Sequence, residues 1–321
     1  MTRRLSIVIP SWNGRELLQR FLPSVMVAAG ESEVVISDDG SSDGTAAWLE
    51  QAYPQARCVA SAANRGFAPA AHAGIEAARG EIVVLLNNDL EVAPDCLGAV
   101  AEWFEDGTLF GVTFRAYDLP ERTFATGGKL GRWRRGFWET WRNYEAGAGG
   151  GRDESFMLVG GFCAFRRQAY LEMGGLDPIF APYYSEDLDL SYRARKRGWR
   201  LGYEPRAKVY HARSSSVNRH RGRFRRQAVI ERNRLLFHWR NLDGGRLARH
   251  LLWAHALLAQ NLLKGNWAYH AGYAQALARV GAVRRFRREE RGHWLCRDAE
   301  LELASGETSL AAAASPGQER I

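Results

Sequence analysis

Residues 81–89 read EIVVLLNND, a run of apolar residues followed by two asparagines and an aspartate. A short run that is apolar on both faces is typical of a strand inside a parallel sheet with helices on either side. Two similar runs lie upstream, LSIVI at 5–9, which Pro10 closes, and EVVIS at 33–37. Together these runs predict neighbouring strands of one sheet.

Patterns typical of helices and of weaker strands fill the intervals between and after these runs. Predicted helices cover residues 14–28, 43–53, 66–79, 94–104 and 186–197. Further extended segments are predicted at 57–60, 109–115 and 200–211. Strands that alternate with helices predict an α/β fold whose sheet is covered on both sides. Residues 118–154 are rich in Gly, Arg and Trp without a clear period, and we predict a long loop there.

The composition fits a globular protein of one large or two small domains. The chain has 321 residues, 46% of them hydrophobic and 25% charged, which excludes disorder, collagen and coiled coil as descriptions of the whole chain. Lys and Arg exceed Asp and Glu by eight, and this excess favours anionic partners such as phosphates, nucleotides or acidic lipids. The four cysteines lie far apart with no C-x-x-C pair, a pattern that predicts reduced thiols in a cytoplasmic protein.

Neither end of the chain has the pattern of a leader or an anchor. The first apolar run, at 5–10, is too short for the core of a signal peptide. The longest apolar stretch, 247–263, is interrupted by Arg249, His250 and His255. We therefore expect no signal peptide and no transmembrane segment.

Acidic side chains follow two of the predicted strands, at the edge where ligands bind in open α/β sheets. Asp38 and Asp39 follow the strand at 33–37, and their adjacent carboxylates suit contacts to a base or ribose, or else a turn. Asn87, Asn88 and Asp89 end the strand at 81–87. A single Asp there is a candidate ligand of Mg²⁺, which proteins bind through one or two carboxylates plus substrate phosphates. A plain turn is the alternative.

A third acidic cluster begins the helix predicted at 186–197. Glu186 and Asp187 either stabilise the first turn of that helix through its dipole or supply a general base. His211 lies at the end of the extended segment predicted at 200–211. A lone His is more often a packed or surface residue than a metal ligand, so its sequence context alone assigns it no role.

Four segments in this order resemble the family 2 glycosyltransferases. They are SIVIPSWNG (6–14), VVISDDGSSDGT (34–45), NRGFAPAAHAGIEAARGEIVVLLNNDLEVAPD (64–95) and GGFCAFRRQAYLEMGGLDPIFAPYYSEDLDLSYRARKRGWRLGYEPRAKVYH (160–211). Within the family, the rhamnosyltransferase-like group of cell-surface polysaccharide assembly is the most similar. The resemblance implies the A-type glycosyltransferase (GT-A) fold, an α/β fold with a mixed, mostly parallel sheet, a Rossmann-like nucleotide-binding half and a C-terminal helical extension.

The resemblance also implies roles for individual residues. The positions that match contacts to the nucleotide sugar are Pro10, Ser11, Trp12, Asp38, Asp39, Arg65, Phe67, Asn87, Asn88 and Gly161. Asp89 and His211 match ligands of a divalent metal, Mg²⁺ or Mn²⁺. Asn87 stands where many members carry Asp, which leaves the choice of metal open. Asp187 matches the catalytic base, with Glu186 beside it.

The implied reaction moves a sugar from a UDP-, dTDP- or GDP-sugar to a hydroxyl of a glycan or lipid-linked acceptor. One base and no motif for a nucleophilic carboxylate predict a single displacement, and therefore inversion at the anomeric carbon. We expect a catalytic domain at 1–240, with a nucleotide-sugar-binding half at 1–115 and an acceptor half at 116–240. A helical extension at 241–303 and a flexible tail at 304–321 follow.

The C-terminal part is basic and aromatic. Arginines cluster at 213–240 and 284–291 around a segment rich in Leu and Trp at 251–269. This pattern predicts either helices that pack on the catalytic domain or attachment to an anionic membrane, which would place the enzyme at the inner face of the cell membrane. The predicted loop carries three tryptophans that either pack on acceptor sugar rings or belong to the core, namely Trp133, Trp138 and Trp141.

Other classes of protein fit less well. The arginines permit nucleic-acid binding, but no recognition motif accompanies them, so we expect no nucleic-acid partner. A dinucleotide-dependent oxidoreductase would carry G-x-G-x-x-G after its first strand, where PSWNG stands at 10–14. A sugar-phosphate nucleotidyltransferase would carry a Gly-rich first loop with a basic residue. It stays as the alternative, together with a catalytically silent sugar-binding relative.

Overall fold

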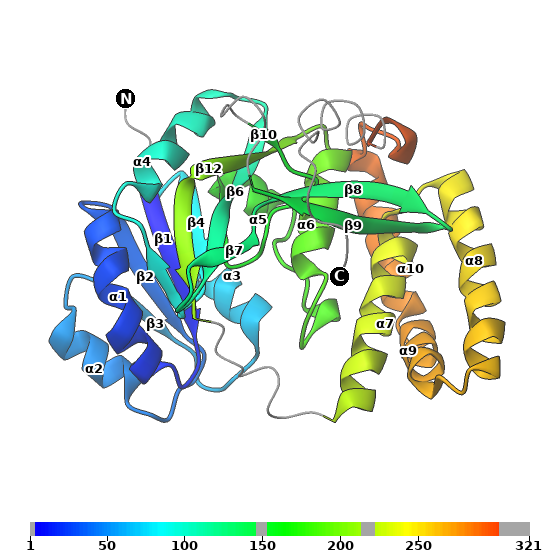
Figure 1. The fold of residues 1–321 in the computed structure, drawn as a ribbon, viewed down its shortest axis with the longest axis horizontal. Coiled ribbons are helices and arrows are strands. Elements are labelled where there is room, and N and C mark those ends of the chain that lie inside the picture. Colours follow the sequence, from blue (N-terminus) through cyan, green and yellow to red (C-terminus); the bar gives the residue numbers. More distant parts are fainter. Residues whose placement is uncertain (1–3, 146–152, 213–221, 302–321) are drawn as a thin grey trace.

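The computed structural model describes residues 4–145, 153–212 and 222–301. Its first part alternates strands and helices, in the order β1 (Leu5–Ser11), α1 (Arg15–Ala29), β2 (Glu33–Asp38), α2 (Thr45–Ala52), β3 (Arg57–Ala60), α3 (Phe67–Ala77), β4 (Ile82–Leu86) and β5 (Leu90–Val92). Figure 1 shows these elements in blue and cyan, with the strands side by side and helices on both faces.

The remaining elements extend the sheet and then leave it. The middle part comprises α4 (Cys96–Ala101), the 3-10 helix η1 (Glu102–Glu105), β6 (Leu109–Asp118), β7 (Thr123–Thr126), β8 (Gly128–Arg134), β9 (Phe137–Tyr144), β10 (Asp153–Glu154), β11 (Phe162–Arg166), α5 (Arg167–Glu172), η2 (Pro178–Phe180), α6 (Glu186–Lys196) and β12 (Arg200–His211). The last part is helical, with α7 (Arg223–Asn241), α8 (Gly244–Leu263), α9 (Trp267–Leu277), α10 (Val280–Glu290) and η4 (Arg291–His293).

One mixed sheet runs through the molecule in the strand order β10-β12-β6-β11-β4-β1-β2-β3. The strands β4, β1, β2 and β3 pair in parallel, and Ser11 lies opposite Asp38 where β1 and β2 end. β11 enters antiparallel between β4 and β6, and β12 runs parallel to β6. The predicted mixed sheet flanked by helices is confirmed.

The central strand β1 shows why its sequence is apolar at successive positions. Ile7 and Ile9 belong to the core cluster that includes Leu22 of α1, whereas Val8 belongs to the cluster on the other face, with Ala71 of α3. Each fully buried side chain of this size stabilises the fold by about 1.5–3 kcal/mol. Both faces of the strand are therefore covered, as the sequence predicts.

The prediction of a loop at 118–154 is wrong over its described residues. β7 pairs with β6, and β8 and β9 form a separate antiparallel sheet. Arg135 and Gly136, which join them, both have positive φ (46° and 76°), as a two-residue hairpin turn of type I′ requires. Arg-Gly is not one of the usual sequences for such a turn, and this hid the hairpin.

Trp138 of this hairpin packs in the protein interior. Trp138 is 3% exposed and donates a 2.9 Å hydrogen bond from Nε1 to the hydroxyl of Tyr192. Trp133 packs edge-on against Trp138, with ring centroids 5.8 Å apart. The hypothesis that Trp138 packs on a sugar ring is therefore wrong, and the side chain of Trp141 lies outside what the structure describes.

The helices α7 to α10 form a layer beside the sheet (Figure 1). Leu235 and Leu236 of α7 share a core cluster with Trp138 of β9 and Tyr192 of α6. The domain boundary predicted after residue 240 falls at the end of α7, and the division into domains stays a prediction. Of the predicted tail at 304–321, no residue is among those described. No helix of the described residues is long and apolar enough to span a membrane.

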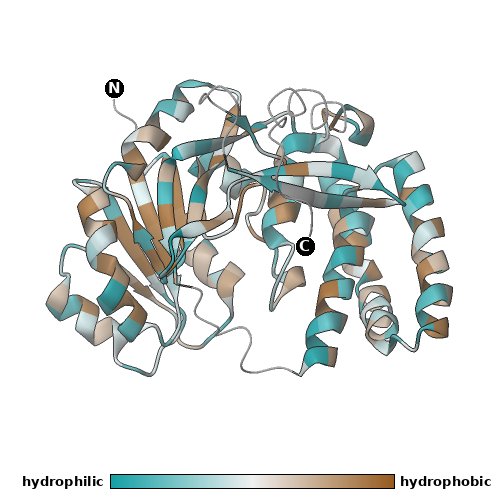
Figure 2. Ribbon diagram, in the orientation of Figure 1, coloured by the Kyte–Doolittle hydropathy of each residue, from teal (hydrophilic) through white to brown (hydrophobic). Residues whose placement is uncertain are grey.

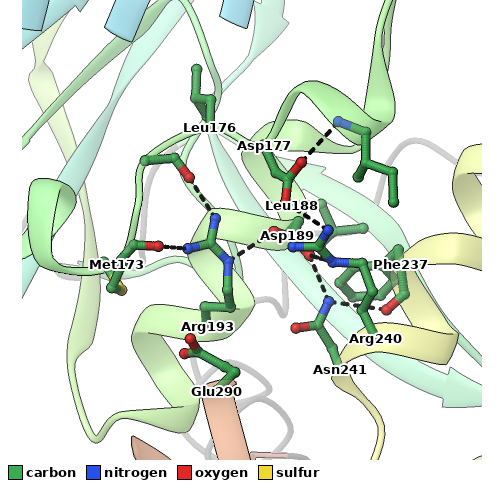
Figure 3. A network of polar contacts seen from close by, with 12 residues as sticks. Met173, Leu176, Asp177, Leu188, Asp189, Arg193, Phe237, Arg240, Asn241 and Glu290 are labelled. Atoms are coloured by element: carbon green, nitrogen blue, oxygen red, sulfur yellow. Dashed lines mark hydrogen bonds and ion pairs between the residues drawn. The ribbon is translucent and has the colours of Figure 1, made fainter. Parts of the chain in front are cut away.

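A buried ionic network joins α6 to α7 (Figure 3). Asp189, fully buried, pairs with Arg193 Nε at 2.8 Å and with Arg240 Nε at 3.4 Å. It also accepts a 2.7 Å hydrogen bond from Asn241 Nδ2. Arg240 pairs in turn with Asp177 at 2.7 Å. Burial by itself raises the pKa of Asp189, but Arg240, Arg193 and Asn241 outweigh it and lower that pKa.

We predict that Asp189→Asn lowers the free energy of unfolding by about 3–5 kcal/mol, because it leaves the buried guanidinium of Arg193 without its carboxylate and that of Arg240 with Asp177 alone. Urea unfolding measures this. The control is Glu91→Gln, which breaks an exposed 2.8 Å pair with Arg122 and should cost less than about 1 kcal/mol. Equal losses in the two variants would contradict a stabilising role for the network.

Two stacked histidines hold the β8–β9 hairpin against the helices. Their rings lie 4.7 Å apart, His238 on α7 and His250 on α8. His238 Nε2 accepts the Trp138 N–H at 2.9 Å, and His250 Nδ1 donates to the Gly136 carbonyl at 2.8 Å. Burial lowers the pKa of His250 to about 4 and, together with the neighbouring His250, lowers that of His238. Both rings are therefore neutral in the folded protein.

Acid should weaken this contact. The unfolded chain takes up a proton at an ordinary His pKa near 6.5, whereas folded His250 does so near 4, so stability falls as pH drops between these values and this contribution is constant below them. Urea unfolding at about pH 7 and about pH 4.5 measures how much the free energy of unfolding falls between them. We expect this fall to be about 2–3 kcal/mol smaller in His250→Asn than in wild type. His293→Gln, at an exposed position, is the control. The same loss in wild type and His250→Asn would refute this.

Candidate functional site

Polar groups meet where β1, β2 and β4 end. Asn88 Nδ2 donates to Ser11 Oγ at 2.9 Å, so the residues after β4 and those ending β1 are in contact. The buried Asp38 carboxylate accepts hydrogen bonds from the backbone N–H and the hydroxyl of Ser41. Pro10 is buried, whereas Trp12 is 54% exposed. The predicted nucleotide contacts from these strands thus lie at one edge of the sheet, and Trp12 is open to a ligand.

Asp39 is bound by the backbone before α3. Its carboxylate accepts hydrogen bonds from the N–H groups of Arg65 (2.9 and 3.0 Å) and Gly66 (2.7 Å). This places Arg65 and Phe67 beside the end of β2, although they are distant from it in sequence. In the structure Asp39 therefore positions these two residues. Its contact with ribose stays a prediction.

Asp89 and His211 lie together, as their predicted shared role requires. His211 Nε2 is 3.2 Å from Asp89 Oδ1, because β12 pairs with β5 and brings His211 opposite Leu90. A carboxylate and an imidazole are ligands that Mn²⁺ accepts, and Mg²⁺ needs only one or two carboxylates beside substrate phosphates. Among the described residues no group of three such side chains is placed to hold a metal. This pair therefore fits a metal whose other ligands come from the substrate.

A glycine turn connects this edge to the third acidic cluster. Gly161 has φ +124°, and a Cβ there would lie 2.4 Å from Asn87 Oδ1. Its carbonyl accepts the Asn87 N–H at 2.7 Å. The N–H of Gly160 donates to Asp187 Oδ2 at 3.1 Å. Only residues without a Cβ allow Asn87 and Asp187 to approach the turn from opposite sides.

Burial keeps the acids of this cluster poorly solvated. It raises the pKa of Asp187, against the lowering effects of the Gly160 N–H and of Lys129. Burial and the neighbouring Asp187 raise the pKa of Glu186 to about 8. Glu186 Oε2 is buried and has no hydrogen-bond partner among the described residues. At neutral pH Glu186 is therefore mostly protonated, and Asp187 is the stronger acid-base candidate because two N–H groups stabilise its charge.

One cleft joins the two halves of the site. It has a volume of about 220 Å³. Its lining residues are Asn64, Arg65, Gly66, Phe67, Ala68, Pro69, Asp177, Ala181, Pro182 and Glu186. The segment predicted to contact the nucleotide thus faces the segment predicted to perform the reaction. The two lie about 120 residues apart in the sequence.

Lys129 of β8 is a charged neighbour of Asp187 that the sequence did not indicate. Its Nζ donates to Thr126 Oγ1 and, at 2.6 Å, to Asn143 Oδ1. Burial lowers the Lys129 pKa to about 8, and Asp187 opposes that shift. The predicted loop at 118–154 gave no reason to place this residue near the site. The only available signal is the rarity of lysine in an arginine-rich chain.

Two residues of α7 also escaped prediction. Asn233 Nδ2 donates to the carbonyls of Tyr183 (2.8 Å) and Tyr184 (2.9 Å), just before Glu186. Arg232 donates to the carbonyl of Ala181 at 2.5 Å. These bonds hold the segment that leads into α6. Arg232 lies in the arginine cluster at 213–240, for which the sequence left packing on the catalytic domain or a membrane surface open; it is 4% exposed.

Comparison with known proteins places the chain in a family. The family model described as "Glycosyl transferase family 2" matches residues 6–174. The chain is 30% identical over 249 residues to an N-acetylglucosaminyl-diphospho-decaprenol L-rhamnosyltransferase of Mycobacterium tuberculosis (strain ATCC 25618 / H37Rv), covering 68% of this chain and 79% of that protein. It is 36% identical over 106 residues to an undecaprenyl-phosphate 4-deoxy-4-formamido-L-arabinose transferase of Pseudomonas fluorescens (strain SBW25), covering 30% of this chain and 31% of that protein.

Solved structures share the fold. S. aureus TarS 1-349 in complex with UDP-GlcNAc superposes with a TM-score of 0.58 at 15% identity, covering 96% of this chain and 91% of that one. The mannosyltransferase PcManGT from Pyrobaculum calidifontis, in complex with GDP-Man and Mn²⁺, gives 0.52 at 19% identity, covering 98% and 86%. With the family model and the mycobacterial relative, these likenesses lead to one conclusion: the chain belongs to glycosyl transferase family 2 and is a glycosyltransferase with the GT-A fold.

Proposed function

We propose that this enzyme transfers a rhamnosyl or related hexosyl group, with inversion, from a nucleotide-diphospho-sugar to a hydroxyl of a lipid-linked glycan in cell-surface polysaccharide assembly. The observation that carries the proposal is the cleft in which residues 64–69 face Glu186. It offers a donor contact and an acid cluster across one space. The rhamnosyl donor and the lipid-diphosphate acceptor are suggested by the name of the mycobacterial relative.

Asp187 acts as the general base in this proposal. It takes the proton of the acceptor hydroxyl as that oxygen forms a bond to the anomeric carbon and the bond to the nucleoside diphosphate breaks. A base must be unprotonated at working pH yet basic enough to accept a proton. Burial raises the pKa of Asp187, and the Gly160 N–H and Lys129 limit the rise. Glu186, with its pKa near 8, is suited to donate a hydrogen bond to a sugar oxygen.

Asp89 and His211 hold the divalent metal in this proposal, Mg²⁺ or Mn²⁺. When bound, the metal would neutralise negative charge on the departing diphosphate. Pro10, Ser11, Trp12, Asp38, Asn87 and Asn88 line the nucleotide side. Asp39 positions Arg65 and Phe67 on that side through the backbone bonds described above. Gly161 keeps the turn beside the donor sugar free of a side chain.

The acceptor implies where the enzyme works. A lipid-linked glycan stays in the membrane, so the enzyme acts in the cytoplasm, at the inner face of the membrane, where nucleotide sugars are available. The donor side admits a UDP-, dTDP- or GDP-sugar.

Asp187→Asn should abolish transfer and preserve donor binding. The amide keeps the shape of the side chain but cannot accept the proton, so we expect kcat to fall at least about 10²–10⁴-fold. Transfer is measured with dTDP-rhamnose and a lipid-diphosphate-linked N-acetylglucosamine, and donor binding by thermal shift with Mn²⁺. Turnover near wild type in Asp187→Asn would exclude Asp187 as the base. If the wild type transfers sugar from none of the nucleotide sugars, the proposed function is wrong.

Lys129→Gln should move the pH dependence of kcat. Transfer needs unprotonated Asp187, so the rate falls as pH drops through the Asp187 pKa. Removing the Lys129 cation raises that pKa further, and we expect the acidic limb to shift upward by about half a pH unit to one unit. Lys208→Gln, the same charge change at an exposed position of β12, should leave the limb in place. An unshifted limb in Lys129→Gln would show that this cation does not act on the base.

A further inference from the structure

The helix α8 carries an apolar surface that no other described element covers. Residues 250–263 read HLLWAHALLAQNLL and contain no Asp, Glu, Lys or Arg. Only His250 and Ala254 of α8 are buried. Leu252 is 74% exposed and Leu263 is 90% exposed. In Figure 1 this helix forms the outer edge of the molecule, and Figure 2 shows brown, hydrophobic segments along it.

The surface continues into the turn before α9. Trp267, the first residue of α9, is 60% exposed, and Leu262 is 54% exposed. Large apolar side chains with so little cover are rare on a surface unless they contact a partner. We call Leu251, Leu252, Leu262, Leu263 and Trp267 the α8 face.

The charge of this layer identifies the kind of partner. Residues 222–301 contain 16 Lys and Arg and six Asp and Glu, so they carry +10, whereas the other residues of the chain carry −2. Arg249 and Lys264, both exposed, lie at the two ends of the uncharged segment. A second copy of the chain would bring another +10 to the same face, and like charges oppose that pairing. An apolar strip bounded by cations instead complements an anionic bilayer surface.

The α8 face also has the required direction. In Figure 1 the carboxyl ends of β1 and β2 and the turn between α8 and α9 lie in the lower part of the molecule, and the segment that leads into α6 extends toward it. The first turn of α7 lies there too, with Phe224, 53% exposed, between exposed arginines 223 and 225. A bilayer at this end would meet the side on which the site opens.

We propose that the enzyme lies on anionic membranes through the α8–α9 end of the α8 face, with Leu262, Leu263 and Trp267 among the lipid headgroups and Lys264 and Arg223 against their phosphates. This deepens the proposed function, on which it rests, because it brings the site to the plane where the diphosphate of a lipid-linked acceptor lies. α8 does not span the bilayer; it contacts one surface.

Co-sedimentation of the full chain with vesicles tests this without any acceptor. We expect binding to phosphatidylglycerol–phosphatidylcholine vesicles at about 0.1 M salt, weaker binding at about 1 M salt, and little binding to pure phosphatidylcholine. The triple variant Leu262→Ser, Leu263→Ser and Trp267→Ser should bind the anionic vesicles at least about tenfold more weakly, because it removes the three side chains that would insert. Arg223→Glu with Lys264→Glu, both at exposed positions, should lose the preference for anionic vesicles.

The matched control is Val27→Ser, which removes an apolar side chain that is 68% exposed on α1, away from the α8 face; it should bind as wild type. All substituted residues are exposed, so thermal unfolding should be nearly unchanged, which verifies the fold of each variant. Unchanged vesicle binding by the triple variant, or no wild-type binding at low salt, would overturn the proposal. So would sedimentation equilibrium showing a wild-type dimer that the triple variant disperses.

Activity separates this inference from the proposed function. If the wild type transfers sugar but does not bind vesicles, the membrane surface is wrong and the transferase proposal stands. If it binds vesicles through the α8 face but transfers no sugar to any acceptor, the membrane surface is correct and the transferase proposal is wrong. The triple variant should lose transfer to acceptor embedded in vesicles and keep transfer to a short-chain, water-soluble acceptor.

Discussion

The charge of Asp189 must be compensated inside the protein, and the arrangement of the site depends on that constraint. A buried carboxylate is stable only with cations and donors in direct contact. Here they come from α6 itself and from the far end of α7, so the two helices are held in one register. Glu186 lies one helical turn before Asp189 on α6, so the contacts that hold Asp189 also hold the start of this helix. The middle of α7 adds the hydrogen bonds from Asn233 to the segment before α6.

The acidic residues of the site divide into two kinds by their surroundings. Asp39 is covered by backbone N–H groups and acts on the loop that carries Arg65. Glu186 and Asp187 lie where burial raises their pKa values, that of Glu186 to about 8. Carboxylates thus differ in their surroundings: Asp39 orders a loop, whereas burial opposes the charged forms of Glu186 and Asp187.

The helical layer links this chemistry to the surroundings of the enzyme. α7 contacts the segment before α6 on one side and α9 on the other, and a Cβ at Gly272 of α9 would lie 2.6 Å from the Ala228 carbonyl. The helices that orient the acid cluster therefore also carry the basic charge and, on α8, the exposed apolar face. The helices that hold the site and the helix face that would contact a membrane therefore belong to one packed layer.

The sequence by itself determined the strands β1, β2 and β4, because a run apolar on both faces has no other stable place than the centre of a covered sheet. It also pointed to the residues after those strands and to Glu186 and Asp187, because carboxylates at strand and helix ends are local features of the chain. Only the tertiary structure decided that Trp138 is core, that the stretch around it is a hairpin, and that Lys129 lies near Asp187. Those facts depend on packing between segments distant in sequence, and a local pattern carries no information about which distant surface will cover it.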